Sequence, residues 1–221
     1  MIYITTTWSW FCLAIAVLLL TTFIMGQLSK QFYTMHIVLR RFSIIDLEFP
    51  AFKGEIKEMV KDIYRLDPAE SQRTLWALRK HLWVDFLFMP AAYGSNFLVC
   101  MNVAGKLNCS GQTFYVALAW AQAIPWILDV IENIYLLNSL HPSVKAFTPI
   151  GLKAWQWLEK FKWGLSLLGM VSGVSALLYF WLTGRYLTSS LPYLAILIGE
   201  VLVFIIISLL SASKKQATPL T

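Results

Sequence analysis

Charge is scarce in this chain of 221 residues. Only 14% of its residues are charged and 58% are hydrophobic, whereas a soluble globular domain has about 25% charged and about 45–50% apolar residues. This shortage excludes an ordinary soluble domain and a disordered chain. Cysteine is also rare, and three cysteines do not make the disulfide framework of a small secreted protein. We therefore expect a polytopic membrane protein.

Familiar signatures of catalysis are missing as well. The sequence has no Walker loop, no G-x-S-x-G, no H-E-x-x-H, no C-x-x-C and no dinucleotide fingerprint. Nothing in it resembles a nucleic-acid motif, although its net charge is +6. We predict no cofactor and no nucleic-acid partner, and we favour a protein that is not an enzyme while leaving that question open.

Long apolar stretches are what the chain has instead. A bilayer core about 30 Å thick needs about 20 apolar residues of helix. Five stretches qualify, at about residues 8–26, 82–105, 113–137, 163–182 and 191–210. The first lacks a positive leading segment and a small-residue cleavage site, so we interpret it as a retained helix and not as a signal peptide. The predicted fold class is an all-α bundle of about five transmembrane helices, forming one membrane domain over residues 1–221.

The basic residues predict how the bundle is oriented. Sixteen of the eighteen Lys and Arg residues fall in segments 27–81 and 138–162 and in the tail from residue 211, and the other two are Lys106 and Arg185. Loops rich in Lys and Arg stay in the cytoplasm. We therefore expect the N-terminus outside and the C-terminus in the cytoplasm, with membrane lipids as the natural partners.

Segment 27–81 is the largest part outside the predicted spans, and its pattern is helical. The stretch GEIKEMVKDIYRL repeats apolar residues at helical spacing. Asp67 and Pro68 are typical of a helix start, and no helix breaker follows before Pro90. We expect this last helix to continue directly into the second span.

Four of the twelve acidic residues lie inside predicted spans: Asp85, Asp129, Glu132 and Glu200. A charged residue at membrane depth costs at least about 2.5–3.5 kcal/mol, so it needs a partner or a cavity. The first three are expected at one depth of the cytoplasmic leaflet on two adjacent helices, and Asn133 shares a helix face with Asp129 and Glu132. The candidate ligand- or ion-binding residues are His81, Asp85, Asp129, Glu132, Asn133 and Glu200.

Three interpretations of these acids stay open. They can be neutralised by protonation or by basic side chains that fold back along the helices. The basic candidates are Arg79, Lys80, Lys145 and Lys153. The acids can also form a functional site for a proton, a cation, a cationic head group or a lipid. A metal centre that adds His81 and His141 to the acids is less favoured, because no tight two-histidine motif is present, and our prediction is no metal.

Small residues and cysteines predict packing. Gly169 and Gly173 form a G-x-x-x-G motif, which lets helices approach closely, either within the chain or in a homo-oligomer or a complex with another membrane protein. A disulfide between Cys100 and Cys109 is an option in an oxidising compartment, but free thiols are favoured.

The stretches HLWVDFLFMPAAYG and LDVIENIYLL, preceded by SIIDLEF, resemble a pattern seen in uncharacterised bacterial multi-pass integral membrane proteins. In that family an aspartate near the start of one span precedes an aromatic-rich run, and a D-x-x-E-N motif lies in the next span. The resemblance covers about residues 43–137. It implies a bacterial inner (plasma) membrane and no particular activity, and it draws attention to Asp46, Glu48, Asp85, Asp129, Glu132 and Asn133.

The leading functional hypothesis is an acidic intramembrane pocket near the cytoplasmic leaflet that binds a cation, a proton or an amphipathic ligand. A second hypothesis is a structural or accessory subunit of a larger membrane complex. A third is an intramembrane lipid-modifying enzyme that uses two of the acids as general acid and base.

Overall fold

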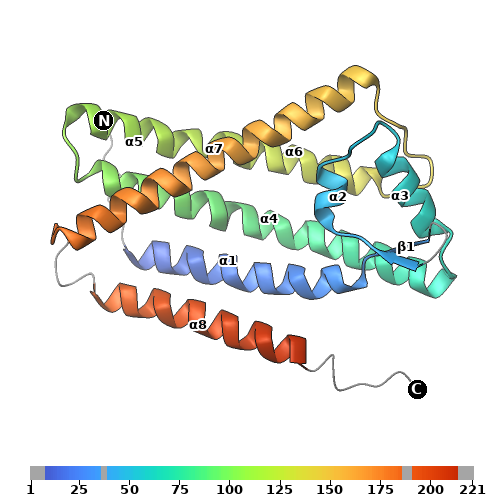
Figure 1. Cartoon of the computed structure of the whole chain (residues 1–221), viewed down its shortest axis with the longest axis horizontal. Coiled ribbons are helices and arrows are strands. Elements are labelled where there is room, and N and C mark those ends of the chain that lie inside the picture. Colours follow the sequence, from blue (N-terminus) through green and yellow to red (C-terminus); the bar gives the residue numbers. More distant parts are fainter. Residues whose placement is uncertain (1–7, 36–38, 186–190, 214–221) are drawn as a thin grey trace.

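The computed structural model describes residues 8–35, 39–185 and 191–213, which form an all-α bundle (Figure 1). Five of the described helices are long and apolar enough to cross a membrane, which confirms the predicted fold class. The elements are α1 (Trp8–Leu28), η1 (Ser29–Gln31), β1 (Tyr33–Met35), β2 (Leu39–Arg41), α2 (Ile44–Glu48), α3 (Glu55–Tyr64), α4 (Pro68–Ala104), α5 (Cys109–Ala121), α6 (Ala123–Ser139), α7 (Pro149–Leu182) and α8 (Leu191–Ser213). The two tail lysines counted for orientation lie outside the described residues.

Helix α4 is the centre of the bundle. It packs against α1, α5, α6 and α7, and α8 packs against the outer side of α1. Figure 1 shows α8, α1 and α4 as successive layers, with α5 and α6 beyond α4 and α7 running obliquely across the bundle. We call the end that carries residues 29–67 the basic end, and the end where α4 meets α5 the opposite end.

The expected continuity of α4 is confirmed. The helix runs without interruption from Pro68 to Ala104, with Asp67 at its N-cap position and Pro90 inside it. Its 37 residues span about 55 Å at 1.5 Å per residue, which exceeds the bilayer core of about 30 Å. The first turns of α4 therefore project beyond the spanning part and carry the short elements of the basic end.

The third predicted span lies within one candidate membrane span, Cys109–Ser139, which is divided into α5 and α6 at Gln122. Gln122, between α5 and α6, keeps right-handed helical backbone angles (φ −65°, ψ −15°), so the division is an interruption of the helical hydrogen bonds and not of the helical backbone angles. Pro125 is the physical reason, because a proline at this position cannot donate a hydrogen bond to the carbonyl of Ala121, four residues earlier. The Gln122 side chain points into the bundle, where it is almost fully buried.

Helix α7 begins much earlier than the fourth predicted span. It starts at Pro149 and not near Trp163, so most of the expected second loop is helical. The start is well formed, because the Thr148 side chain accepts a hydrogen bond from the backbone of Gly151 at 3.0 Å and proline suits the first helical position. This correction places Glu159 and Lys162 on a bundle helix.

The elements of the basic end pack onto the bundle through a compact apolar core. The expected amphipathic helix is α3, which buries Ile56, Val60 and Ile63 against α4 and the end of α6. A short antiparallel pair, β1 and β2, was not predicted. Helix α7 holds the chain after α2, because the Trp155 indole and the Gln156 amide donate to the carbonyls of Glu48 and Pro50, each at 2.8 Å.

Candidate functional site

A groove of about 730 Å³ runs along the bundle between α1, α4 and α7, and α2 lies at its basic end. One wall is a single face of α1, because its lining residues recur every three or four positions. These residues are Phe11, Ile15, Leu18, Thr22 and Met25. They cover about 21 Å along the helix axis at 1.5 Å per residue, so the groove is long enough to follow much of a lipid chain.

The groove is apolar toward the opposite end and polar toward the basic end. Val99 of α4 and Met170 and Val174 of α7 line the apolar part. The polar part is lined by charged and hydrogen-bonding side chains from α2, α4, α6 and α7. These are Glu48, His81, Asp85, Tyr93, Ser95, Asn96, Asp129, Lys162 and Ser166. The groove therefore has the amphipathic character of a lipid.

Lys162 is the only cation on the wall of the groove among the residues described, and it sits among carboxyl groups. Its ammonium lies 2.7 Å from Asp129 Oδ1 and 2.6 Å from Glu159 Oε2, and it also contacts Glu132. Glu132, Glu159 and Lys162 are almost fully buried, so this ion cluster is shielded from water. A buried charge is tolerated only when it is paired and hydrogen-bonded, and Lys162 provides that pairing for three acids.

Asp85 is held in a different way. The Asn133 amide donates a hydrogen bond to Asp85 Oδ2 at 2.7 Å and another to the backbone of Leu82 at 3.3 Å. Both of these hydrogen bonds of the Asn133 side chain therefore go to α4. They hold Asp85 at the groove wall. Tyr93, two turns further along α4, donates its hydroxyl to Asp129. These contacts join α4 to α6 beside the clustered acidic residues.

Glu48 brings a further carboxyl group to the basic end of the groove. The pKa of Glu48 is raised to about 7, mainly by burial and also by the nearby Glu159, Asp85 and Asp129, against the opposing effect of Lys162. Carboxyl oxygens of Glu48, Glu132 and Glu159 lie within 4.8 Å of one another. Such a triad can hold a metal ion, but the Lys162 ammonium contacts two of its members and takes the place of that cation.

A polar network closes the groove wall beyond Tyr93. The Asn96 amide donates to Gln122 Oε1 and to the backbone of Ser166, both at 3.3 Å. The Gln122 amide donates in turn to the backbone of Leu165 at 3.3 Å. Gln122 thus links α4 and α7, and it also donates to the backbone of Leu118 on α5.

The structure brings together five of the six predicted site residues. Asp85, Asp129, Glu132 and Asn133 form the cluster described above, and His81 lines the basic end of the groove with its ring 5.4 Å from that of Phe32. Glu200 is apart, because it lies on α8, and its Oε2 is buried without a hydrogen-bond partner in the described part of the chain.

Several other predicted participants also lie elsewhere. His141 is exposed and bonds to Ser143, so it does not join the acids. The side chains proposed to neutralise the acids are exposed; they are Arg79, Lys80, Lys145 and Lys153. Lys162 has that role instead, although the sequence predicts a loop at its position.

Sequence reasoning missed Lys162 and Glu159 for a definite reason. Both lie before the first strongly apolar stretch of the fourth span, in LEKFKWG, where hydropathy is typical of a loop. The available signal was their spacing, because positions i and i+3 share a helix face. Trp155, Trp157 and Trp163 accompany them, and tryptophans of this kind are typical of the membrane boundary.

The roles of Gly169 and Gly173 are visible within the chain. A Cβ atom on Gly169 would lie 2.4 Å from Gln122 Nε2, and one on Gly173 would lie 2.8 Å from Val99 Cγ1. The motif thus lets α7 approach α4 and the α5–α6 break. A contact between copies through these glycines stays a prediction. Cys100 and Cys109 are free thiols.

Comparison with protein-family models, with curated proteins and with solved structures finds no match to this chain. The groove and its side chains are therefore the basis for a functional argument. Chemically, they offer hydrogen-bond acceptors at one end of an apolar channel.

Proposed function

We propose that this chain is an integral membrane protein that binds an amphipathic molecule in the groove. The ligand's hydrocarbon chain lies between α1, α4 and α7, and its head group lies at the carboxyl-rich basic end. One observation carries the proposal: a single groove of about 730 Å³ joins an apolar channel to a cluster of acids. A ligand with both characters satisfies both parts, whereas a bare proton or metal ion leaves the apolar part without a role.

The composition of the head-group region favours a cationic or hydrogen-donating group. Three carboxyl groups, those of Glu48, Asp85 and Asp129, line the groove with one ammonium, that of Lys162. Asp129 is paired with Lys162, whereas Asp85 receives only a neutral amide. A primary amine beside Asp85 supplies the positive charge and the donors that this carboxyl group lacks.

The ligand reaches the groove from the bilayer. Leu167 and Met170, on the α7 wall, are 47% and 44% exposed, and in a membrane such surfaces face lipid. A molecule already dissolved in the bilayer can enter sideways without crossing water. Its chain exchanges one apolar environment for another, so the hydrophobic effect adds little, and retention depends on head-group contacts and on how the chain fits the groove.

The distribution of Lys and Arg supports an orientation with the N-terminus outside, and the resemblance to bacterial multi-pass membrane proteins favours the inner (plasma) membrane of a bacterium. In that orientation the basic end of the bundle faces the cytoplasm. The proposed head-group site then lies in the cytoplasmic leaflet.

Two alternative functions predict different features. The enzyme hypothesis predicts a cavity that reaches both Asp85 and Glu132, but only Asp85 of these two lines the groove, and Glu132 contacts Lys162. A role as an accessory subunit is favoured by Glu200, whose buried Oε2 has no hydrogen-bond partner in the described part of the chain. Copurification with a stoichiometric membrane protein is the result that the subunit role predicts.

Binding of the ligand's hydrocarbon chain is tested with two probes that have a sixteen-carbon chain and different head groups. Purified protein in lipid nanodiscs is titrated with radiolabelled hexadecylamine and with hexadecanoate. We expect saturable binding of the amine and much weaker binding of the acid. Leu167→Trp fills the groove and should abolish amine binding. Its matched control is Leu168→Trp, because Leu168 is the next residue on α7 and does not line the groove.

The head-group part is tested with Asp85→Asn, which keeps the shape of the side chain and removes its charge. We expect the affinity for hexadecylamine to fall roughly tenfold or more, as for the loss of one charge-assisted hydrogen bond. Glu200→Gln makes the same chemical change outside the groove and should leave binding unchanged. Equal binding by wild type and by the Leu167→Trp and Asp85→Asn variants would contradict the proposed function.

A further inference from the structure

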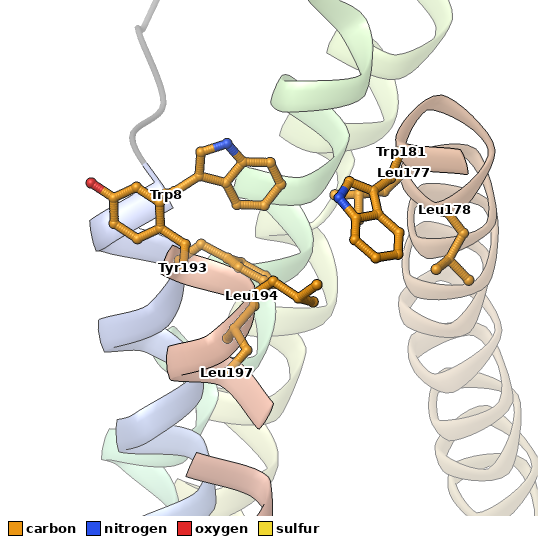
Figure 2. A pocket seen from close by; sticks show the side chains of 8 residues that line it. Trp8, Leu177, Leu178, Trp181, Tyr193, Leu194 and Leu197 are labelled. Atoms are coloured by element: carbon orange, nitrogen blue, oxygen red, sulfur yellow. The ribbon is translucent and has the colours of Figure 1, made fainter. Parts of the chain in front are cut away.

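A second, smaller cleft lies at the opposite end of the bundle, between α7 and the pair formed by α1 and α8. Figure 2 shows Trp8, Leu194 and Leu197 on one side of this cleft and Leu177 and Trp181 on the other. Its volume is about 100 Å³ and its lining is apolar or aromatic. An apolar cavity of about 150 Å³ takes up benzene, so this cleft has room for the end of a hydrocarbon chain and not for a polar head.

The cleft continues the groove along the same two helix faces. Phe11 lines both spaces. On α7, Val174 lines the groove and Leu177 and Leu178 line the cleft, and residues three or four apart share a helix face. Phe11 therefore stands where the two spaces meet, and a chain that extends past it enters the cleft.

The combined length matches the membrane. Lining residues on α1 now run from Trp8 to Met25, which is about 26 Å along the helix axis. The hydrocarbon core is about 30 Å thick. A chain held with its head at the basic end and its end in the cleft extends across nearly the whole core, much further than one leaflet.

We infer that the cleft is a chain-end subsite, and that the protein selects amphipaths whose single chain is long enough to pass Phe11. This inference rests on the proposed function, because the head group must be held at the basic end for chain length to be measured. The occupant is the far end of the same ligand, because the cleft adjoins the groove at Phe11, is lined by apolar or aromatic side chains and lies between the same helices α1 and α7.

The test measures selectivity for chain length. Decylamine, hexadecylamine and eicosylamine compete for the radiolabelled hexadecylamine site in nanodiscs, with affinities compared at equal mole fractions in the lipid. We expect wild type to prefer eicosylamine over decylamine. Leu197→Trp fills the cleft and should weaken eicosylamine binding roughly tenfold while leaving decylamine binding unchanged.

Ile196→Trp is the matched control. Ile196 precedes Leu197 on α8, is 47% exposed and does not line the cleft, so this variant should retain the wild-type preference. If Leu197→Trp keeps the preference for eicosylamine, the chain-end subsite is wrong while the head-group site stands. If wild type binds all three amines equally, the subsite is also wrong. If it binds none of them, both the subsite and the proposed function fall.

Discussion

At the scale of single residues, Lys162 is the side chain on which the site depends. Its ammonium contacts Asp129, Glu132 and Glu159, and these four groups come from only two helices, α6 and α7. Without the lysine, three carboxyl groups face one another in a volume shielded from water. Removing one partner from a buried ion pair costs about 3–5 kcal/mol, because the other charge is left uncompensated.

Lys162→Met is therefore expected to lower the free energy of unfolding by about 3–5 kcal/mol. The measurement is thermal or denaturant unfolding of the purified protein in detergent. Lys153→Met is the control, because Lys153 is an exposed lysine on the same helix and should be close to neutral.

A compensating variant separates charge from shape. Adding Glu132→Gln and Glu159→Gln to Lys162→Met removes two of the uncompensated acids and should recover part of the lost stability. If Lys162→Met is as stable as Lys153→Met, the ion cluster does not hold α6 and α7 together.

At the scale of secondary-structure elements, α7 makes three different sets of contacts along its length. Its first turns hold the chain after α2 through Trp155 and Gln156. Its middle supplies Lys162 to the acids. Beyond that, Gly169 allows the helix to pack on Gln122. The oblique course of α7 (Figure 1) lets one helix contact both the basic end and the far wall of the groove.

Gly169→Ala is expected to destabilise the protein by about 1–3 kcal/mol, the usual cost of overpacking. The added methyl group would overlap Gln122 Nε2 and disturb the bond that this glutamine accepts from Asn96 and the one that it donates to Leu165. Gly164→Ala is the control on the same helix, because a Cβ atom there meets nothing within 4 Å, and alanine favours helix by about 1 kcal/mol. Equal midpoints of unfolding for the two variants would argue against close packing at Gly169.

At the scale of the whole molecule, the two ends of the bundle differ in chemistry. The acids and the short elements gather at the basic end, and the aromatic cleft lies at the opposite end. The orientation of these ends in the membrane decides which leaflet supplies the head group of the ligand.

Cys109 allows this orientation to be measured without engineering a label. It is an exposed thiol at the start of α5, at the opposite end, whereas Cys12 and Cys100 are buried. We expect a membrane-impermeant maleimide to label Cys109 in intact bacterial cells and Cys109→Ser to abolish the labelling. In the Cys109→Ser background, Glu70→Cys at the basic end should react only after the cells are permeabilised. The reverse pattern would invert the proposed topology.

The sequence by itself determined the number of spans, the continuity of α4 and the amphipathic face of α3. These features depend on local composition and on the helical period, which are readable along the chain. It also pointed to Asp85, Asp129, Glu132 and Asn133, because charge is so scarce that each acid inside a span stands out. The structure places these four residues together, as their expected depth indicated.

The tertiary structure alone decided the partner of the acids and the shape of the site. Lys162 lies just before an apolar stretch, so hydropathy assigned it to a loop, and only the early start of α7 at Pro149 brings it inside. Pro125 signalled a disturbance, but the burial of Gln122 depends on the helices around it. The groove has no signature in the sequence, because it exists only where residues from α1, α4 and α7, far apart in the chain, enclose a common space.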